Sequence, residues 1–338
     1  MKQLNLAING FGRIGRIVLR LIYQHGLQKN LKIAALNDLT DSRTLAHLLK
    51  HDSVHRKFDQ EVSWDDNSLT VGPDKIKIMA VKNPAELPWK DMGVEVVLEC
   101  TGLFTKREKA AQHLQAGARK VLISAPSPDA DVTLAYGVNT AAYQSDKHDV
   151  LSCASCTTNC LAPVAAVIVD NFGVSRASMT TIHSYTNDQN VLDLPHKDLR
   201  RARAAGMSMI PTTTGAAKAI GLVIPKLAGK ADGFAVRVPT PDVSLVDFVA
   251  EVERDTTVEE VNRALKTASQ NSLKGILGFS EEPLVSSDFI GCEFSSVVDA
   301  ASTMVIQKRL VKVVAWYDNE VGFSARMVDV CRLIGEKL

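Results

Sequence analysis

The sequence predicts an α/β fold in two parts, and three observations support this prediction. Short apolar strands alternate with segments of helical composition over residues 1–150. A glycine-rich turn joins the first strand to the first helix, and strand-like segments follow one another more closely after about residue 150. Alternation is typical of βαβ units in a parallel sheet. We expect the second part to be an α+β domain with a mixed, largely antiparallel sheet.

Each predicted element has a local signal. Strands are predicted where apolar, β-branched runs end at small or turn-forming residues, at 4–10, 31–38, 94–102, 120–126, 177–186, 233–240, 244–253, 302–307 and 310–318. Helices are predicted at 13–26, 106–118, 161–173 and 257–270. Thr257 and Glu260 have the spacing of a capping box at the start of the last of these. Apolar residues at helical spacing over 319–338 predict a closing helix.

Composition limits the classes of partner. The formal net charge of 338 residues is +1, so no global field favours nucleic acid or an anionic membrane. The N-terminus lacks a signal-peptide pattern, and no run approaches about 18 uncharged apolar residues, so we expect no membrane-spanning helix. The six cysteines are scattered through a large chain, which favours reduced thiols in a cytoplasm over a disulfide framework.

The segment GFGRIG places Gly10, Gly12 and Gly15 between the first strand and the first helix. Gly10 permits the tight turn, Gly12 allows a pyrophosphate to approach the backbone, and Gly15 allows close packing of the helix on the strand. The next strand ends at Asp38, at the spacing expected of a residue that binds a ribose. A tight turn without a ligand is the alternative. The context favours a Rossmann-type dinucleotide-binding domain for NAD, because the charge of Asp38 would repel the 2′-phosphate of NADP.

Three cysteines, Cys153, Cys156 and Cys160, are close together in the chain. They could hold a metal or an iron–sulfur cluster, form a redox pair, or be buried as small apolar side chains. A closed metal site usually needs four ligands, and no fourth cysteine or histidine lies nearby. A redox pair would sit in a small βαβ context. We therefore predict no metal, and we interpret Cys153 and Cys160 as buried packing residues.

Cys156 differs from its neighbours because it stands at the expected start of a helix. A helix N-terminus together with a base can lower a thiol pKa from about 8.5 to between about 3.5 and 7.5. His183 lies about one helix and one strand further on and is the candidate base. The backbone N–H of Cys156 could also stabilise an oxyanion. These residues predict one nucleophilic thiol with a histidine partner.

Six motifs run in order along essentially the whole chain: INGFGRIGR, ASCTTNCLAP, TTIHSYTNDQ, IPTTTGAAKAIG, RVPTPDVS and WYDNEVGFS. Together they resemble the phosphorylating, NAD-dependent glyceraldehyde-3-phosphate dehydrogenase family. The cysteine motif is highly specific, and the glycine motif is not. The resemblance implies an NAD-binding domain at 1–153, a catalytic domain at 154–319, and a C-terminal helix at 320–338 that returns to the first domain. It also implies a cytoplasmic homotetramer in glycolysis or gluconeogenesis.

The resemblance implies a chemistry that suits a cysteine and a histidine. Cys156 would attack the aldehyde of glyceraldehyde 3-phosphate, and His183 would take the proton as hydride passes to NAD. Inorganic phosphate would then attack the thioester and release the acyl phosphate. Covalent catalysis retains the energy of aldehyde oxidation that hydrolysis would lose.

The resemblance also assigns binding residues. It implies two phosphate pockets. The pocket for the substrate phosphate would use Thr186 and Arg237, and Arg201 would be a further phosphate contact. The pocket for the attacking phosphate would use Ser155, Thr157, Thr214 and Gly215. The basic run around Arg201 lacks the aromatic partners of a nucleic-acid patch. NAD would be held by Gly10, Phe11, Gly12, Arg13, Ile14, Asn37, Asp38, Lys82, Thr101, Gly102, Ser124 and Asn319. Lys82 stands where many relatives have arginine, so it keeps the charge but loses the planar fork. Leu194 and Pro195 resemble the NAD-using members.

Two other functions remain open at this point. Erythrose-4-phosphate dehydrogenase has similar motifs and often releases its acid by hydrolysis, although TNDQ and TTTGAAKA look more like the glyceraldehyde-3-phosphate enzymes. A redox-sensing or interaction protein could also use a reactive thiol without turnover. The presence of Cys156, His183, Arg237 and Asn319 together argues against this second alternative.

Overall fold

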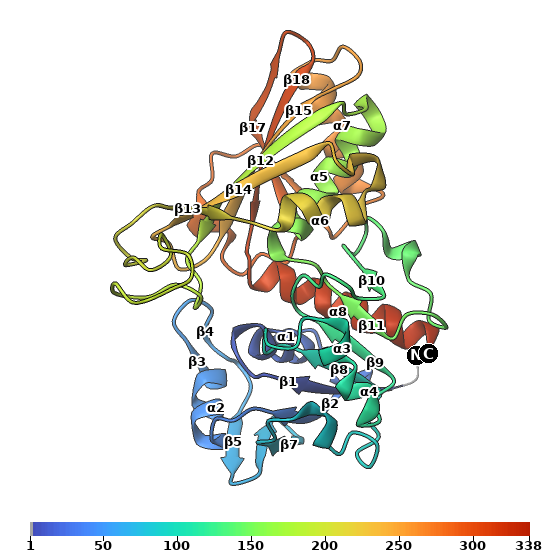
Figure 1. The fold of residues 1–338 in the computed structure, drawn as a ribbon, viewed down its shortest axis with the longest axis vertical. Coiled ribbons are helices and arrows are strands. Elements are labelled where there is room, and N and C mark those ends of the chain that lie inside the picture. The colour runs from blue at the N-terminus through green and yellow to red at the C-terminus, as the bar shows by residue number, and fades with distance from the viewer. Residues whose placement is uncertain (1–2) are drawn as a thin grey trace. The chain divides into compact units, whose positions relative to one another are not determined.

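The computed structural model describes residues 3–338, apart from the side chain of Lys218, and the chain forms two compact units (Figure 1). The first unit contains the described residues up to Leu134, together with Ala141–Ala154 and Ser324–Leu338. The second unit contains Ala135–Thr140 and Ser155–Phe323. None of the helices formed by residues 3–338 combines the length and the apolar character needed to cross a bilayer.

The first unit is built on a nine-stranded sheet with the order β10-β11-β9-β8-β1-β2-β7-β6-β5. Neighbouring strands from β10 to β7 are parallel, and only the pairs that involve β6 are antiparallel. The strands are β1 Leu4–Asn9, β2 Leu31–Asn37, β5 Val62–Asp65, β6 Ser68–Val71, β7 Asp74–Met79, β8 Val96–Glu99, β9 Lys120–Ile123, β10 Val132–Thr133 and β11 Val150–Ser152. A separate two-stranded ladder joins β3 His51–Asp52 to β4 Arg56–Lys57.

The helices of the first unit include those predicted at 13–26 and 106–118 and one, at 42–50, that the sequence analysis did not predict. They are α1 Arg13–Gln24, α2 Ser42–Lys50, α3 Arg107–Ala110, α4 Gln112–Gln115 and most of α8 Val321–Lys337. The single helix predicted at 106–118 is wrong in detail, because it is divided at Ala111 into α3 and α4. The N–H of Leu114 donates to the carbonyl of Ala111, which is the tighter i to i+3 pattern of a 3-10 turn. Further short 3-10 helices lie at Leu27–Lys29, Pro84–Glu86, Thr140–Ala142, Pro225–Leu227 and Ser286–Phe289.

The second unit is built on a seven-stranded sheet with the order β13-β14-β12-β15-β18-β17-β16. Four of its neighbouring pairs are antiparallel, and the pairs β12–β14 and β16–β17 are parallel. The strands are β12 Arg176–Ser184, β13 Ile210–Thr213, β14 Ala231–Val238, β15 Ser244–Glu251, β16 Leu277–Ser280, β17 Ser296–Ile306 and β18 Leu310–Tyr317. The predicted fold class, a parallel-sheet domain followed by a mixed, largely antiparallel one, is therefore confirmed.

One strand of this sheet is longer than predicted. The strand expected at 302–307 is only the second half of β17, which begins at Ser296. The register against β18 shifts between Asp299 and Met304. Such an irregularity interrupts the alternation of inward and outward side chains. The first half of β17 therefore does not continue the pattern of the second half.

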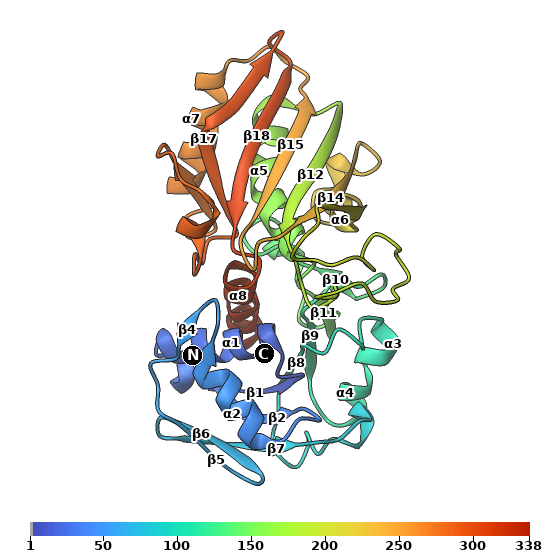
Figure 2. The ribbon, with the colours of Figure 1, turned by 90° about the vertical axis from the view of Figure 1, so that its left-hand side faces the viewer.

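Three helices cover one face of the second sheet: α5 Cys156–Phe172, α6 Ala216–Val223 and α7 Val258–Gln270. Figure 2 shows β17, β18, β15 and β12 side by side, with α5 behind them. The core between the layers includes Ile168 of α5, Phe248 of β15 and Val313 of β18, all almost fully buried. The Thr257 hydroxyl accepts the N–H of Glu260 and so caps α7, but the Glu260 side chain bonds Thr256, which gives half of the predicted capping box.

Candidate active site

Cys156 is the first residue of α5. The Ser155 hydroxyl caps this helix by accepting the N–H of Thr158 at 3.0 Å. The first N–H groups of a helix have no partner within the helix, so they and the helix dipole form a positive end. The N–H groups of Cys156 and Thr157 lie close enough to the Cys156 sulfur to favour its thiolate form. The helix start therefore places the candidate nucleophile and a candidate oxyanion donor at the same residue.

His183 approaches this thiol from β12. Its Nε2 lies 3.5 Å from the Cys156 Sγ, and its Nδ1 lies 2.7 Å from the Ser184 carbonyl oxygen. A carbonyl oxygen can only accept, so Nδ1 must carry the hydrogen. Nε2 of the neutral ring is then an acceptor that faces the thiol. This geometry fits His183 as the candidate base for Cys156.

The pKa values of this pair differ from the sequence-based expectation. Burial raises the pKa of the Cys156 thiol, although the Arg237 guanidinium and Thr157 act in the opposite direction. Burial also lowers the pKa of His183 to about 3, and Arg237 adds to this effect. Loss of hydration therefore opposes the low thiol pKa that the helix N-terminus favours. Burial of the two groups favours a neutral thiol beside a neutral imidazole.

Arg237 supplies the positive charge of the site. It lies opposite His183 in the parallel ladder between β12 and β14, and its Nη1 donates to the Thr186 hydroxyl at 3.0 Å. Its Nε is buried and makes no hydrogen bond to any residue that the structure describes. A buried donor of this kind is costly unless a ligand satisfies it. The orphaned Nε therefore fits an anion bound beside Thr186.

Arg201 is held differently from Arg237. Its guanidinium is tied to Asp188, to the Thr212 hydroxyl at 3.0 Å and to the Thr213 carbonyl at 3.3 Å. It remains close enough for its charge to lower the pKa values of both His183 and Arg237. Its contribution to an anion pocket would thus be mainly electrostatic unless its contact with Asp188 opens.

The residues predicted for the second anion pocket come from two helix starts. Ser155 caps α5, whereas the Thr157 hydroxyl is buried against the Tyr317 hydroxyl at 2.8 Å. Thr157 can therefore offer its backbone more readily than its side chain. Thr214 and Gly215 precede α6, and Gly215 is exposed.

Asn319, the residue predicted for the nicotinamide end of the cofactor, is buried after β18. Its Oδ1 accepts from the hydroxyls of Ser184 and Ser244.

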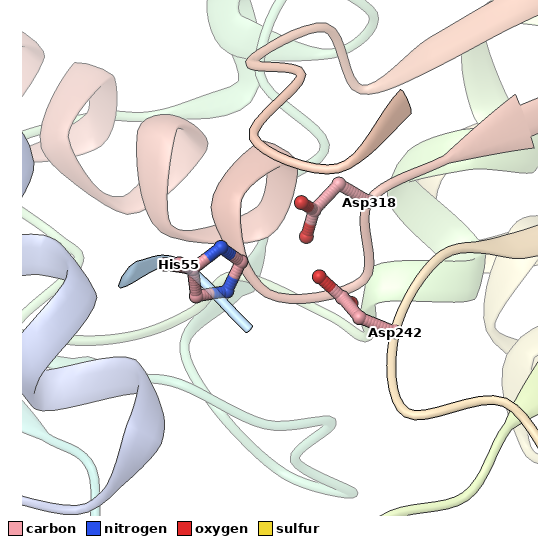
Figure 3. Close-up of side chains that lie close together, drawn as sticks. All are labelled: His55, Asp242 and Asp318. Carbon is pink, nitrogen blue, oxygen red and sulfur yellow. The ribbon is translucent and has the colours of Figure 1, made fainter. Parts of the chain in front are cut away.

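The residue before Asn319 is Asp318, whose carboxyl group lies close to that of Asp242. Asp318 accepts the N–H groups of Glu320 and Val321 with one oxygen and the N–H of Gly291 with the other. A carboxyl oxygen of Asp242 lies within 4.8 Å of one from Asp318, and Figure 3 shows the two groups directed toward each other. Burial, together with the charge of Asp318, raises the pKa of Asp242 to about 9. Burial and the neighbouring charge therefore favour the protonated form of Asp242.

The candidate cofactor residues of the first unit lie where parallel strands end. β1, β2, β8 and β9 end at Asn9, Asn37, Glu99 and Ile123, and ligands of such sheets bind at this carboxyl edge. The predicted residues here follow or end these strands: Gly10, Phe11 and Gly12 after β1, Asn37 and Asp38 at β2, Thr101 and Gly102 after β8, and Ser124 after β9.

The glycine turn has the shape that a dinucleotide needs. A Cβ atom on Gly10, which has φ +89°, would lie 2.7 Å from the Thr101 nitrogen, and one on Gly15 would lie 2.5 Å from the Gly10 oxygen. Gly12 has no atom of the described residues within 4 Å of its Cβ position. The turn is thus closed toward the protein and open at Gly12, which precedes α1. The residues present fit a pyrophosphate at the helix N-terminus.

The side chains around this turn have separate roles. Asp38 accepts the N–H of Phe11 at 2.8 Å and that of Thr40 at 3.0 Å, so its carboxylate is fixed beside the turn. Arg13 forms a two-point ion pair with Asp52, so its guanidinium is held by the protein. Lys82 is exposed.

Asn37 is buried, and its amide is bonded to Asn9 and Val81. It would therefore shape the cofactor site rather than contact a ligand through its side chain.

Sequence reasoning missed several residues that support these sites. Glu99 is buried, accepts from Asn9 at 2.6 Å and from the Thr101 N–H at 2.9 Å, and so ties the ends of β1 and β8 together. Tyr317 bonds both Thr157 and Thr181 and packs edge-on against His183. Glu99 could have been identified from the sequence, because it is a carboxylate at the end of the apolar strand that precedes residues 100–102. Nothing in the local pattern identified the partners of Tyr317.

Comparison with known proteins identifies the family. The model of the glyceraldehyde 3-phosphate dehydrogenase NAD-binding domain matches residues 4–107, and the model of the C-terminal domain of the same family matches residues 155–319. The chain is 58% identical over 332 residues to the glyceraldehyde-3-phosphate dehydrogenase of Geobacillus stearothermophilus, covering 98% of both chains.

Two further relatives agree with this result. Glyceraldehyde-3-phosphate dehydrogenase 1 of Bacillus subtilis is 58% identical with the same coverage, and the Pseudomonas aeruginosa enzyme is 57% identical over 96% of both chains. The predicted NAD-binding domain and the predicted family are both confirmed. With matches to both domain models and relatives of this identity along almost its whole length, the chain belongs to the glyceraldehyde-3-phosphate dehydrogenase family.

Proposed function

We propose that this chain oxidises D-glyceraldehyde 3-phosphate with NAD and inorganic phosphate to 1,3-bisphosphoglycerate. The observation that carries this proposal is the 3.5 Å contact between the Cys156 Sγ and the His183 Nε2, with Nδ1 held by the Ser184 carbonyl. The orphaned Nε of Arg237 supports an anionic substrate. Family membership supports the same reaction.

The residues divide the reaction between them. Cys156 gives its proton to His183 and attacks the aldehyde carbon, and the Cys156 N–H stabilises the oxygen anion that forms. His183 returns the proton to this oxygen, which completes the hemithioacetal. His183 then accepts the hydroxyl proton as the carbon is oxidised to a thioester. NAD, when bound, accepts the hydride. Inorganic phosphate attacks the thioester carbon, the Cys156 sulfur leaves, and the acyl phosphate is released.

Binding roles follow from the same proposal. Thr186 and Arg237, with Arg201, would hold the substrate phosphate, and Ser155, Thr157, Thr214 and Gly215 would hold the attacking phosphate. Residues 1–153 with 320–338 would bind NAD, and residues 154–319 would carry the catalytic groups. Asn319 would bind the nicotinamide end of NAD.

We also propose that the chain works as a cytoplasmic homotetramer in glycolysis or gluconeogenesis. The segment 191–209 exposes apolar side chains to an unusual degree, with Val191 86%, Leu199 82% and Met207 84% exposed. The second sheet likewise exposes Phe234, Met304 and Ile306. Exposed apolar groups of this kind are typical of surfaces that another chain covers.

The first test is formation of NADH, measured at about 340 nm, from glyceraldehyde 3-phosphate with and without inorganic phosphate. A rate that requires phosphate is expected, because the acyl phosphate forms only when phosphate attacks the thioester. A rate that does not change with phosphate would instead indicate hydrolytic release and the erythrose-4-phosphate reaction. Absence of turnover with either sugar would favour a thiol-based sensor.

A further inference from the structure

Two buried serines hold the Asn319 amide in one orientation. The Ser184 hydroxyl donates to the Asn319 Oδ1 at 2.7 Å, and the Ser244 hydroxyl donates to the same oxygen at 2.8 Å. Ser184, Ser244 and Asn319 are 0%, 2% and 7% exposed, so water does not replace these bonds readily. All three residues belong to the second unit. Ser184 is the last residue of β12, Ser244 is the first of β15, and Asn319 follows β18.

Both hydrogen bonds run from a serine hydroxyl to the amide oxygen of Asn319. The N–H of Ser184 donates to the Ser244 hydroxyl oxygen at 3.1 Å, so that oxygen already accepts one hydrogen. Its own hydrogen is directed to the Asn319 Oδ1 at 2.8 Å, a shorter contact than the 3.4 Å to the Ser184 hydroxyl. Two hydroxyl donors require an acceptor, and only the carbonyl oxygen of an amide accepts. The NH2 group of Asn319 is therefore the end left to bind a ligand.

Ser184 also contacts His183 and Arg237 through its backbone carbonyl group. Its carbonyl oxygen accepts the Nδ1 hydrogen of His183 at 2.7 Å and lies 3.3 Å from the Arg237 Nη1. One residue thus holds the base through its backbone and Asn319 through its side chain. The hydroxyl can be removed without removing the carbonyl, so the two roles can be separated by substitution.

We propose that Ser184 and Ser244 are positioning residues that fix the Asn319 amide so that its NH2 group is presented to the carboxamide oxygen of bound nicotinamide. The proposal rests on the assignment of Asn319 to the nicotinamide end of NAD. A carboxamide has an acceptor end and a donor end, so an amide turned by half a rotation would select the opposite end. The two serines would thereby decide which face of the nicotinamide ring receives hydride.

A thermodynamic cycle tests this without any turnover. NAD binding is measured by calorimetry for wild type, Ser244→Ala, Asn319→Ala and the double variant. Ser244→Ala is expected to weaken the NAD Kd by about threefold to tenfold, the value of one or two lost hydrogen bonds. In the Asn319→Ala background the same substitution should have almost no effect, because the serine acts through Asn319. Additive losses would overturn the proposal.

The face of hydride transfer is the second readout, and a general structural defect would not change it. Glyceraldehyde 3-phosphate with deuterium on the aldehyde carbon is oxidised, and NMR of the NADH reports which C4 position carries deuterium. Wild type should label one position, and the Ser184→Ala/Ser244→Ala variant should label both. Labelling of a single position by that variant, with an NAD Kd within about twofold of wild type, would refute the proposal.

Ser296→Ala is the matched control for these experiments. Ser296 is a fully buried serine of the same sheet, and its hydroxyl contacts the Cys160 sulfur at 3.4 Å instead of Asn319. It should retain the wild-type NAD Kd and single-face transfer. The calorimetric cycle stays valid even if wild type has no phosphate-dependent turnover, so failure of the proposed function and failure of this proposal are distinguishable.

Discussion

The Nε2 atom of His183 lies 3.5 Å from the Sγ atom of Cys156, and burial shifts the pKa values of both groups toward their neutral forms. This differs from a preformed thiolate–imidazolium pair. In a neutral pair the proton would move from sulfur to nitrogen as the nucleophile is used, so we expect His183 to act in the first chemical step. The helix start would then contribute mainly by stabilising the oxygen anion that follows.

Replacement of the nucleophile should separate binding from chemistry. Cys156→Ala is expected to lower NADH formation by more than about 10³-fold. NAD binding measured by calorimetry should persist, because the dinucleotide turn at Gly10–Gly15 does not contain Cys156. Cys160→Ala is the control, since Cys160 is fully buried beside Ser296 and should affect stability more than turnover. Residual turnover near the wild-type rate in Cys156→Ala would remove it as the nucleophile.

The thiol should titrate above its ordinary range in the free protein. Because burial raises the pKa of Cys156, its thiolate fraction is small at pH 7 and increases about tenfold with each pH unit below the pKa. The rate of alkylation by iodoacetamide is therefore expected to rise continuously from pH 6 to pH 9. A plateau already reached near pH 6 would indicate an ion pair with His183 instead. His183→Asn tests whether the Cys156 thiol and the His183 imidazole are coupled. This substitution should change the rate of alkylation much less than the rate of turnover.

Asp38 should control the choice of cofactor. Its carboxylate is fixed by the N–H groups of Phe11 and Thr40, so it cannot easily move away from a 2′-phosphate. Asp38→Gly is expected to improve the ratio of kcat/KM for NADP over NAD by at least about tenfold, because a like charge is removed. Asp41→Asn is a nearby control, since Asp41 caps α2 through Thr44. An unchanged ratio in Asp38→Gly would mean that other contacts exclude NADP.

Arg237 should be irreplaceable by another cation. Its Nη1 donates to the Thr186 hydroxyl and its Nε is buried, so an anion bound there would receive a planar fork of donors. Arg237→Lys keeps the charge and loses the fork, and we expect KM for glyceraldehyde 3-phosphate to rise by about 10- to 100-fold. Arg176→Lys, an exposed arginine of the same strand as His183, is the matched control. Equal KM values for both variants would argue against the substrate pocket.

The sequence predicted those parts of the fold and site that local pattern encodes. Strand–helix alternation and the GFGRIG turn predicted the parallel sheet, and the position of Cys156 before an apolar helix predicted a helix start. The pairing of His183 with Arg237 across β12 and β14 could not be derived, because it depends on strands separated by more than fifty residues. The effect of burial on the thiol pKa of Cys156 could not be derived from the sequence, because burial is a tertiary property. The serines that orient Asn319 come from strand ends that only the sheet order brings together.

Asp242 should make stability depend on pH in an unusual direction. Its pKa is about 9 in the folded chain, because of burial and the charges of Asp318 and Glu320, and 3.8 is its ordinary value. Between these values the folded state holds a proton that the unfolded state releases, so the free energy of unfolding falls as pH rises. The maximum slope is about 1.4 kcal/mol per pH unit. Below about pH 4 both states are protonated and this loss is absent.

Asp242→Asn removes the titrating group and keeps nearly the same shape. The variant is therefore expected to have a higher Tm than wild type at pH 8, with a difference that shrinks steadily toward pH 5. Thermal unfolding followed at each pH gives this difference directly. Asp170→Asn removes the same charge from an exposed position beside Lys226, and its Tm difference from wild type should stay constant over that range. A Tm difference for Asp242→Asn that does not change with pH would mean that Asp242 is ionised in the folded chain.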